Sequence, residues 1–155
     1  MSWRKIDVDQ YDEDAYTEEE FLAEFDSGLS LAEIESQAQT RNTDVRNLMT
    51  RGDLNSALIQ SLENPPYGRN VDSAKFLSTQ TVVDVLNASR ATDIPDMIKT
   101  LSNDQRDTLM KYIYAGMAKP ESFNSSVLLT WHEKLTEVTG TGSIVRVLTD
   151  KRSLV

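Results

Sequence analysis

The sequence predicts an all-α protein, with about seven helices in an α–α superhelix-like stack and an extended acidic arm at the N-terminus. Two observations predict the helices: apolar residues recur at steps of three and four, and most of these runs are bounded by capping residues and by glycine or proline. A third observation, the uneven distribution of charge, separates the arm, residues 1–28, from a helical body, residues 29–155.

The negative charge of the chain is concentrated at its N-terminal end. Residues 1–35 contain twelve acidic and two basic side chains, whereas the remaining residues contain 13 acidic and 14 basic ones. An acidic arm on a nearly neutral body repels phosphate backbones and anionic lipids, so we expect neither nucleic acid nor a membrane as a partner. The arm suits a basic or hydrogen-bond-donating protein surface instead.

Aromatic residues are spaced along the arm: Trp3, Tyr11, Tyr16, Phe21 and Phe25. Low hydrophobicity keeps disordered segments solvated, so these aromatics favour a segment that folds against a partner over a plain disordered tail. The sequence leaves both interpretations open. Within the arm, residues 17–25 (TEEEFLAEF) predict a weak helix, with Thr17 as the cap and Glu20 three residues later.

In the body, side chains that can cap a helix N-terminus precede most of the apolar runs. These caps are Ser30 with Glu33, Asp53, Thr92 or Asp93, Ser102 with Gln105, and Asn124 or Ser125. Glycine and proline supply the stop signals, because proline cannot continue a helix and glycine adopts the conformation that ends one. The stop signals are Gly52, the stretch 64–66 (NPP), Pro120, and Gly140 with Gly142.

The predicted helices lie between these signals. The first two cover residues 31–39 and 43–49, and a third begins after Asp53. A longer helix covers about 72–90. The remaining ones start after Asp93, Ser102 and Asn124, with residues 143–148 as the last.

Two of these segments are rich in β-branched residues and would pass as strands by propensity, namely 81–86 (TVVDVL) and 143–148 (SIVRVL). Their apolar residues also fit a buried helix, and no hairpin turn adjoins either, so we predict helices. Weak internal sequence similarities, such as that between DLNSALIQ from residue 53 and DIPDMIKT from residue 93, slightly favour stacked helix pairs over a four-helix bundle.

The only histidine lies in the stretch LLTWHEKLT (128–136). His132 and Glu133 begin like an H-E-x-x-H zinc motif, but Thr136 stands at the last position and the chain has no cysteine, so the ligands of a catalytic zinc are missing. On a helix, His132 would lie at the edge of an apolar stripe, beside Trp131. That stripe is Leu128, Trp131, Leu135 and Val138.

Other motifs give no support for catalysis. The stretch TGTGS (139–143) follows a helix, whereas a dinucleotide site needs a strand before its glycines. The acidic pairs of the arm lack the glycine and glutamate that a calcium-binding EF-hand requires. We therefore predict no catalytic residue, no metal, no cofactor and no enzymatic activity.

Residues 109–117 (LMKYIYAGM) carry more apolar side chains than one helical stripe can hold. Either this helix is buried on most sides, or its spare face contacts another protein. The same choice between core and interface applies to Tyr112, Tyr114 and Trp131, which are the possible interface residues of the body.

Five stretches spread over nearly the whole chain form a recognisable set. In order, they are RKIDVDQYDED, SALIQSLENPP, LMKYIYAGM, SSVLLTWHEKL and GSIVRVLT. This set resembles the signature stretches of the smallest, p16 subunit (subunit 5) of the actin-related protein 2/3 complex.

The resemblance implies a non-catalytic structural role in a multi-subunit assembly that nucleates branched actin filaments in the cytoplasm and cytoskeleton. It implies that the body docks on a WD-repeat propeller subunit and a core scaffold subunit, and that the arm tethers actin-related protein 2. The actin filament would be contacted through the assembled complex. The arm motif consists of Arg4, Lys5, Ile6, Asp7, Val8, Asp9, Tyr11, Asp12 and Glu13.

Two other function classes stay open. The first is an acidic-armed helical adaptor for an unrelated basic protein. The second is an enzyme with a site around His132, in which case replacing His132 would abolish an activity.

Overall fold

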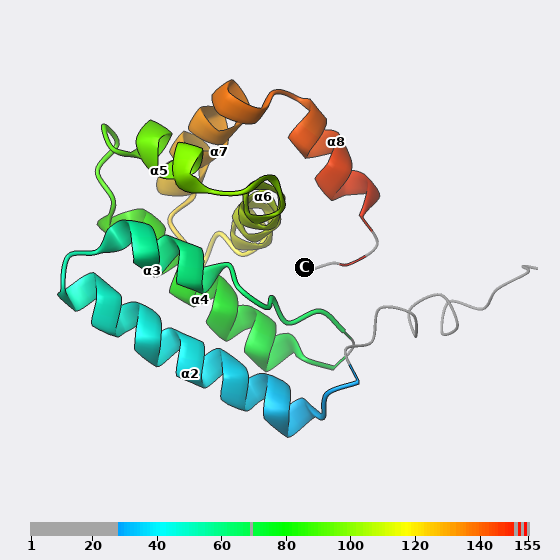
Figure 1. Ribbon diagram of the computed structural model, residues 1–155. Coiled ribbons are helices and arrows are strands. Elements are labelled where there is room, and N and C mark those ends of the chain that lie inside the picture. Colours follow the sequence, from blue (N-terminus) through cyan, green and yellow to red (C-terminus); the bar gives the residue numbers. More distant parts are fainter. Residues whose placement is uncertain (1–27, 69, 151, 153, 155) are drawn as a thin grey trace, which may run out of the picture.

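The computed structural model describes residues 28–68 and 70–150 together with 152 and 154 (Figure 1). Every regular element in these residues is a helix, so the all-α prediction is confirmed for them. The predicted arm and its helix over 17–25 lie outside the described residues. The seven helices are α2 (Leu31–Thr50), α3 (Leu54–Ser61), α4 (Asp72–Ala88), α5 (Ile94–Thr100), α6 (Asn103–Met117), α7 (Ser125–Thr139) and α8 (Gly142–Thr149).

Most of the predicted caps are present. The side chains of Ser30 and Ser102 each accept a hydrogen bond from the backbone N–H three residues later. In return, the backbone N–H of each serine donates to the side chain of that residue, Glu33 or Gln105, which completes a capping box. Asp53 accepts from the Ser56 N–H at 3.0 Å, and Asn124 accepts from the Ser126 N–H at 3.0 Å. These local signals therefore determine where α2, α3, α6 and α7 begin.

Three local predictions are wrong. The helices expected over 31–39 and 43–49 are one continuous helix, α2, because neither glycine nor proline separates them and buried residues continue along one face. Asp93 stands at the N-cap of α5, but its side chain makes no capping hydrogen bond, because its backbone there is helical and not extended. Its carboxylate accepts from the Thr92 hydroxyl at 2.9 Å. Gly142 does not close α7 but is the first residue of α8.

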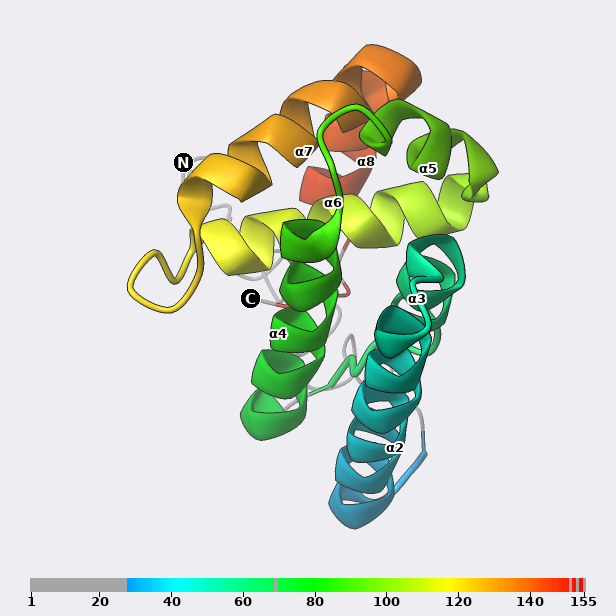
Figure 2. The same ribbon diagram turned by 90° about the vertical axis from the view of Figure 1, so that its left-hand side faces the viewer.

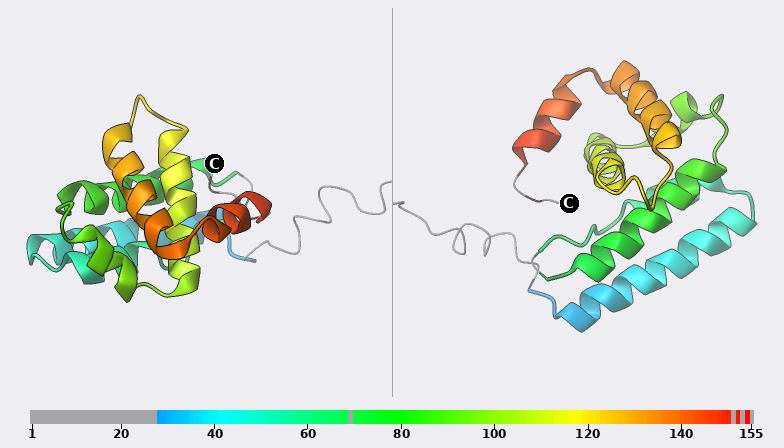
Figure 3. Two further views of the ribbon diagram at one scale, coloured as in Figure 1. Left: turned by 90° about the horizontal axis from the view of Figure 1, so that it is seen from above. Right: turned by 180° about the vertical axis from the view of Figure 1, so that it is seen from behind.

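The helices pack in two groups. Helices α2, α3 and α4 contact one another and form one layer, and α6 runs across the end of that layer (Figure 2). Helix α6 also contacts α7 and α8, and α5 packs on α7. Helix α8 lies against α6 on the side away from α2 (Figure 3). Helix α6 therefore has neighbours on most of its sides.

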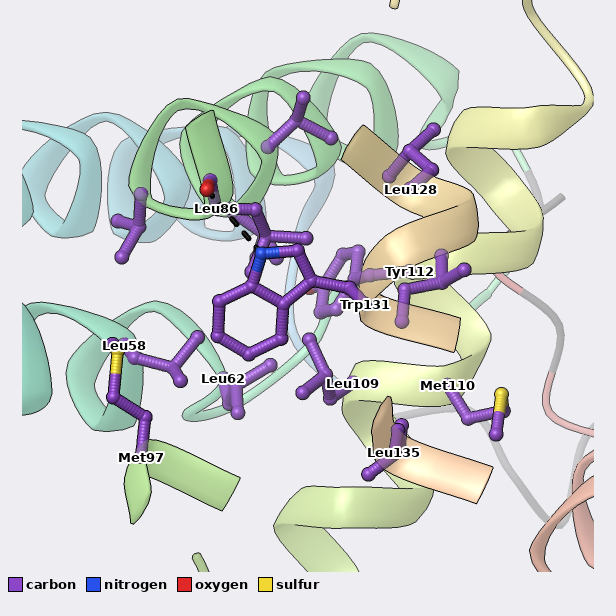
Figure 4. Close-up of a cluster of buried hydrophobic side chains, with 14 of the residues drawn as sticks. Leu58, Leu62, Leu86, Met97, Leu109, Met110, Tyr112, Leu128, Trp131 and Leu135 are labelled. Atoms are coloured by element: carbon purple, nitrogen blue, oxygen red, sulfur yellow. Dashed lines mark hydrogen bonds between the residues drawn. The ribbon is translucent and has the colours of Figure 1, made fainter. Parts of the chain in front are cut away.

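The main core forms around Trp131 of α7, which is 0% exposed and surrounded by leucines from four helices (Figure 4). Its indole N–H donates to the carbonyl oxygen of Leu86 in α4 at 3.3 Å, so the buried polar atom is satisfied. A smaller second core lies between α2 and α4. Its buried members are Ile34, Ala38, Val71 and Ala74.

Gly116 allows α6 and α7 to approach closely. A Cβ at this position would lie 2.9 Å from Cδ1 of Leu128, and Leu128 is fully buried. The glycine is needed here for space, because its backbone conformation is ordinary helix.

We expect Gly116→Ala to lower the free energy of unfolding by about 1 to 3 kcal/mol, because an added methyl group overpacks this contact. Leu128→Ala alone should lower it by about 2 to 5 kcal/mol. In the Leu128→Ala background, Gly116→Ala should be neutral or stabilising, since the clash is gone and alanine favours helix. Urea unfolding followed by circular dichroism measures all four proteins. An equal cost of Gly116→Ala in both backgrounds would contradict the packing explanation.

Candidate functional site

The three possible interface residues of the body occupy different places. Tyr112 and Trp131 are each 0% exposed, so the core alternative holds for both and neither has surface to offer a partner. Tyr114 is half-buried, and its hydroxyl lies 3.2 Å from Nε2 of His132. The two rings meet edge to face, with centroids 5.6 Å apart.

His132 lies at the edge of the apolar stripe of α7, as predicted, and Glu133 points to solvent. Three members of the stripe are buried, but Val138 is 38% exposed, so the stripe is one residue shorter than predicted. The Tyr114 hydroxyl forms a hydrogen bond with Nε2 of His132, so this ring nitrogen is already engaged. Among the described residues, no three His, Cys, Asp or Glu side chains gather closely enough to hold a metal ion.

None of the helices in the described ranges is long and apolar enough to span a membrane.

A polar cleft lies between α2 and α3, and its buried arginine is already engaged. Arg41 donates hydrogen bonds to the carbonyl oxygens of Glu63 and Asn64, just after α3, and to the Ser78 hydroxyl in α4 at 3.2 Å. Burial lowers the pKa of the Arg41 guanidinium. Burial also raises the pKa of the nearby Tyr112 phenol, whose oxygen has no hydrogen-bond partner within the part of the chain that the structure describes. The cleft therefore has a structural role, joining α2 to the α3–α4 connection. Its lining is Ser36, Gln37, Thr40, Arg41, Asp44, Gln60, Glu63 and Asn64.

Helix α8 carries the most exposed apolar surface among the described helices. Val145 is 58% exposed and Leu148 is 72% exposed, whereas Ile144 and Val147 pack against the main core. We call Val145 and Leu148 the outer face of α8. The sequence did contain a signal for it, because residues 144, 145, 147 and 148 are all apolar and span about 160° around a helix, which is wider than an ordinary core-facing stripe. The other large exposed apolar residues are Leu29, Leu31, Phe76, Leu129 and Val138.

Two ion pairs connect α8 to α6. In the first, Arg146 donates to both carboxylate oxygens of Asp107, at 2.7 Å from Nε and 2.9 Å from Nη2. In the second, the Lys111 ammonium lies 2.7 Å from Asp150 Oδ2, and the Lys111 side chain is only 7% exposed. Fork-shaped arginine contacts and buried lysine contacts are both orientation-dependent, so these pairs fix how α8 sits on α6.

Lys111 also binds the segment that follows α8. Its ammonium donates to the carbonyl oxygen of Arg152 at 3.1 Å and to the Tyr67 hydroxyl at 3.2 Å, and it lies 4.7 Å from the centroid of the Tyr67 ring. Leu154, two residues further, is 4% exposed and belongs to the main core. Lys111 thus joins α6, the α3–α4 connection and the C-terminal segment.

Asp150 supplies the negative charge of this cluster. Partial burial raises the pKa of Asp150, but hydrogen bonds from Arg152 and Lys111 outweigh that effect and hold the pKa well below its usual range. The carboxylate therefore stays ionised at neutral and mildly acidic pH.

Comparison with known proteins gives a family and close relatives. The model of the family described as ARP2/3 complex 16 kDa subunit (p16-Arc) matches residues 2–154. The chain is 38% identical to actin-related protein 2/3 complex subunit 5-C of Xenopus laevis, over 98% of this chain and 94% of the relative. It is 34% identical to subunit 5 of Saccharomyces cerevisiae, over 98% and 97%, and 32% identical to the human subunit 5-like protein, over 98% and 94%.

We expect Asp150→Asn to lower the free energy of unfolding at pH 7 by about 1 to 3 kcal/mol, less than for a fully buried pair, because Asp150 is partly exposed. A carboxylate with a lowered pKa stabilises the fold above its ordinary pKa of about 4, and this contribution is lost as the pH falls below it. The difference between wild type and Asp150→Asn should therefore be constant above about pH 5 and shrink towards pH 2. Urea unfolding across this range measures it, and a difference that grows on acidification would contradict the assignment.

Proposed function

The chain belongs to the ARP2/3 complex 16 kDa subunit (p16-Arc) family, and from this membership we propose that it acts as a non-catalytic structural subunit of the actin-related protein 2/3 complex. Its body docks on the scaffold of the complex, a WD-repeat propeller subunit and a core subunit. Its arm tethers actin-related protein 2. The assembled complex contacts the side of an actin filament, and the site of action is the actin cytoskeleton in the cytoplasm.

The outer face of α8 is the observation that supports docking by the body. Val145 and Leu148 expose aliphatic side chains one helical turn apart, on a helix whose other apolar residues are partly buried and pack against the core. Scattered exposed apolar residues are ordinary, but an exposed pair that extends the core-facing apolar side of the same helix favours a second contact surface. We assign this surface to a scaffold subunit.

The charge distribution supports the tether. The acidic excess lies in residues 1–35, and the rest of the chain carries a net charge of +1. An extended segment of 27 residues can reach at most about 90 Å, so an arm leaving the body at Gly28 has ample reach to a neighbouring subunit. A tether raises the effective concentration of its binding segment at the target, to about the millimolar range for a short flexible linker, so weak contacts are enough.

We expect Leu148→Asp to reduce incorporation of the protein into the complex by about tenfold or more, because a charge placed in a docked apolar face must be desolvated. The matched control is Leu129→Asp. Leu129 is also an exposed leucine, at 57%, but lies on α7, so its substitution should leave incorporation unchanged. Co-purification of the complex subunits with each tagged variant gives the measurement. Equal incorporation of Leu148→Asp and wild type would contradict docking through α8.

Deletion of residues 1–25 should leave the body in the complex and loosen actin-related protein 2. The reason is that removing the tether abolishes its effective-concentration advantage and leaves the body contacts intact. Quantitative mass spectrometry of pull-downs should show unchanged propeller and core subunits, and less actin-related protein 2 after dilution. A truncated bait that retains actin-related protein 2 as firmly as wild type contradicts the tether. If neither bait recovers any subunit of the complex, the adaptor for an unrelated basic protein takes its place.

A further inference from the structure

Helix α8 has one broad apolar side, which consists of two adjacent pairs of equal composition that we call its inner and outer faces. The inner face consists of Ile144 and Val147, and the outer face consists of Val145 and Leu148. Each face combines one valine with one four-carbon aliphatic side chain, and both pairs are spaced three residues apart. A turn of about 100° around the helix axis brings the outer face to the position of the inner face and turns the inner face outward. Since hydrophobic stabilisation follows the apolar area that is buried, it scarcely distinguishes the two orientations.

The charged residues between α6 and α8 do distinguish them. Asp107 and Lys111 stand four residues apart on α6, and Arg146 and Asp150 stand four residues apart on α8 and its C-cap. Along α6 the negative residue comes first and the positive one second, whereas along α8 the order is reversed. Each residue therefore lies beside one of opposite charge. We call these two ion pairs the charge ladder.

We propose that the charge ladder selects which apolar face of α8 is turned outward. In the exchanged orientation both pairs are broken, and the buried Lys111 ammonium loses Asp150, which is costly in a protein interior. A slip of α8 by one turn is also penalised, because it places Asp107 opposite Asp150. Ser143 adds a third restraint at the other end of α8, where its hydroxyl bonds the Gly140 carbonyl oxygen at 3.0 Å.

This inference concerns the isolated chain, and only its use in docking rests on the proposed function. An ion pair with exposed atoms adds little to stability, but it disfavours wrong arrangements through like charges and unpaired charges. The charge ladder therefore keeps Val145 and Leu148 exposed in the isolated chain, in the orientation that a partner would contact.

The chain has no cysteine, so a single introduced thiol reports the exposure of its position without interference. Val145→Cys and Val147→Cys are made in the full-length protein, and their rates of reaction with a soluble thiol reagent are compared. In the native charge background we expect position 145 to react at least about tenfold faster than position 147, which corresponds to about 1.4 kcal/mol. With Asp107→Asn and Asp150→Asn added, this ratio should fall towards one.

The matched control removes two ion pairs elsewhere by the same kind of change, with Asp96→Asn and Glu137→Gln. These carboxylates pair with Lys99 and Lys134 within their own helices, so the ratio should stay at its native value. Circular dichroism establishes that each protein is folded. If the ratio stays native in folded Asp107→Asn/Asp150→Asn protein, the proposal is wrong.

A second pair of variants covers the case in which that double substitution does not fold. Asp107→Asn alone removes only the more exposed pair and should lower the ratio partway. Exchanging the charges of that pair, with Asp107→Arg and Arg146→Asp, should restore the ratio, because the ion pair is rebuilt with its polarity reversed. Failure to restore it overturns the proposal. No partner is present in these measurements, so their result is independent of whether Leu148→Asp affects incorporation.

Discussion

The structure of the body depends on one requirement, that α6 be covered on nearly every side. This helix buries five consecutive residues, 109–113, and five consecutive residues occupy all sides of a helix. No single neighbour can cover such a helix, so α4, α7 and α8 all pack on it. Trp131 fills the space between α7 and α4, and Gly116 removes the side chain that would hold α7 away.

Two buried cationic side chains, Arg41 and Lys111, stabilise the non-helical segments that follow α3 and α8. A chain segment that leaves a helix has carbonyl groups without helical partners, and burying them unsatisfied is costly. Arg41 binds two such carbonyls after α3, and Lys111 binds one after α8. Arg41 has a forked guanidinium that reaches several acceptors at once, whereas Lys111 is a compact charge that requires the carboxylate of Asp150 beside it. Both cations lie on helices and bind non-helical segments. Each of them therefore fixes the position of a connecting segment relative to a helix.

How much of this could be predicted from the sequence depends on the range of the interactions. The caps at Ser30, Asp53 and Ser102 act within three residues, and the sequence alone predicts them correctly. The continuity of α2 agrees with the lack of glycine and proline in residues 31–50, but the packing of its buried face on α3 and α4 depends on contacts that no local pattern contains. The burial of Tyr112 and Trp131 could not be separated from an interface role for the same reason. Aromatic side chains serve both purposes, and only the positions of the other helices decide between them. The roles assigned to the arm residues stay predictions.

The outer face of α8, proposed as a docking surface, must meet two requirements that conflict in an isolated protein. It must expose apolar side chains, and the helix must still keep one orientation. A docking surface needs exposed apolar groups, yet a helix whose buried and exposed apolar pairs are alike has little hydrophobic reason to prefer one orientation. Charged pairs resolve this conflict, because their energy depends on sign and position whereas burial depends only on area. The pair Arg146–Asp107 is exposed enough to add little to stability, and Lys111–Asp150 is buried enough to make the wrong orientation costly. A near-neutral body can therefore carry a specific contact surface when its few charges lie between helices, while the chain's acidic excess stays in the arm.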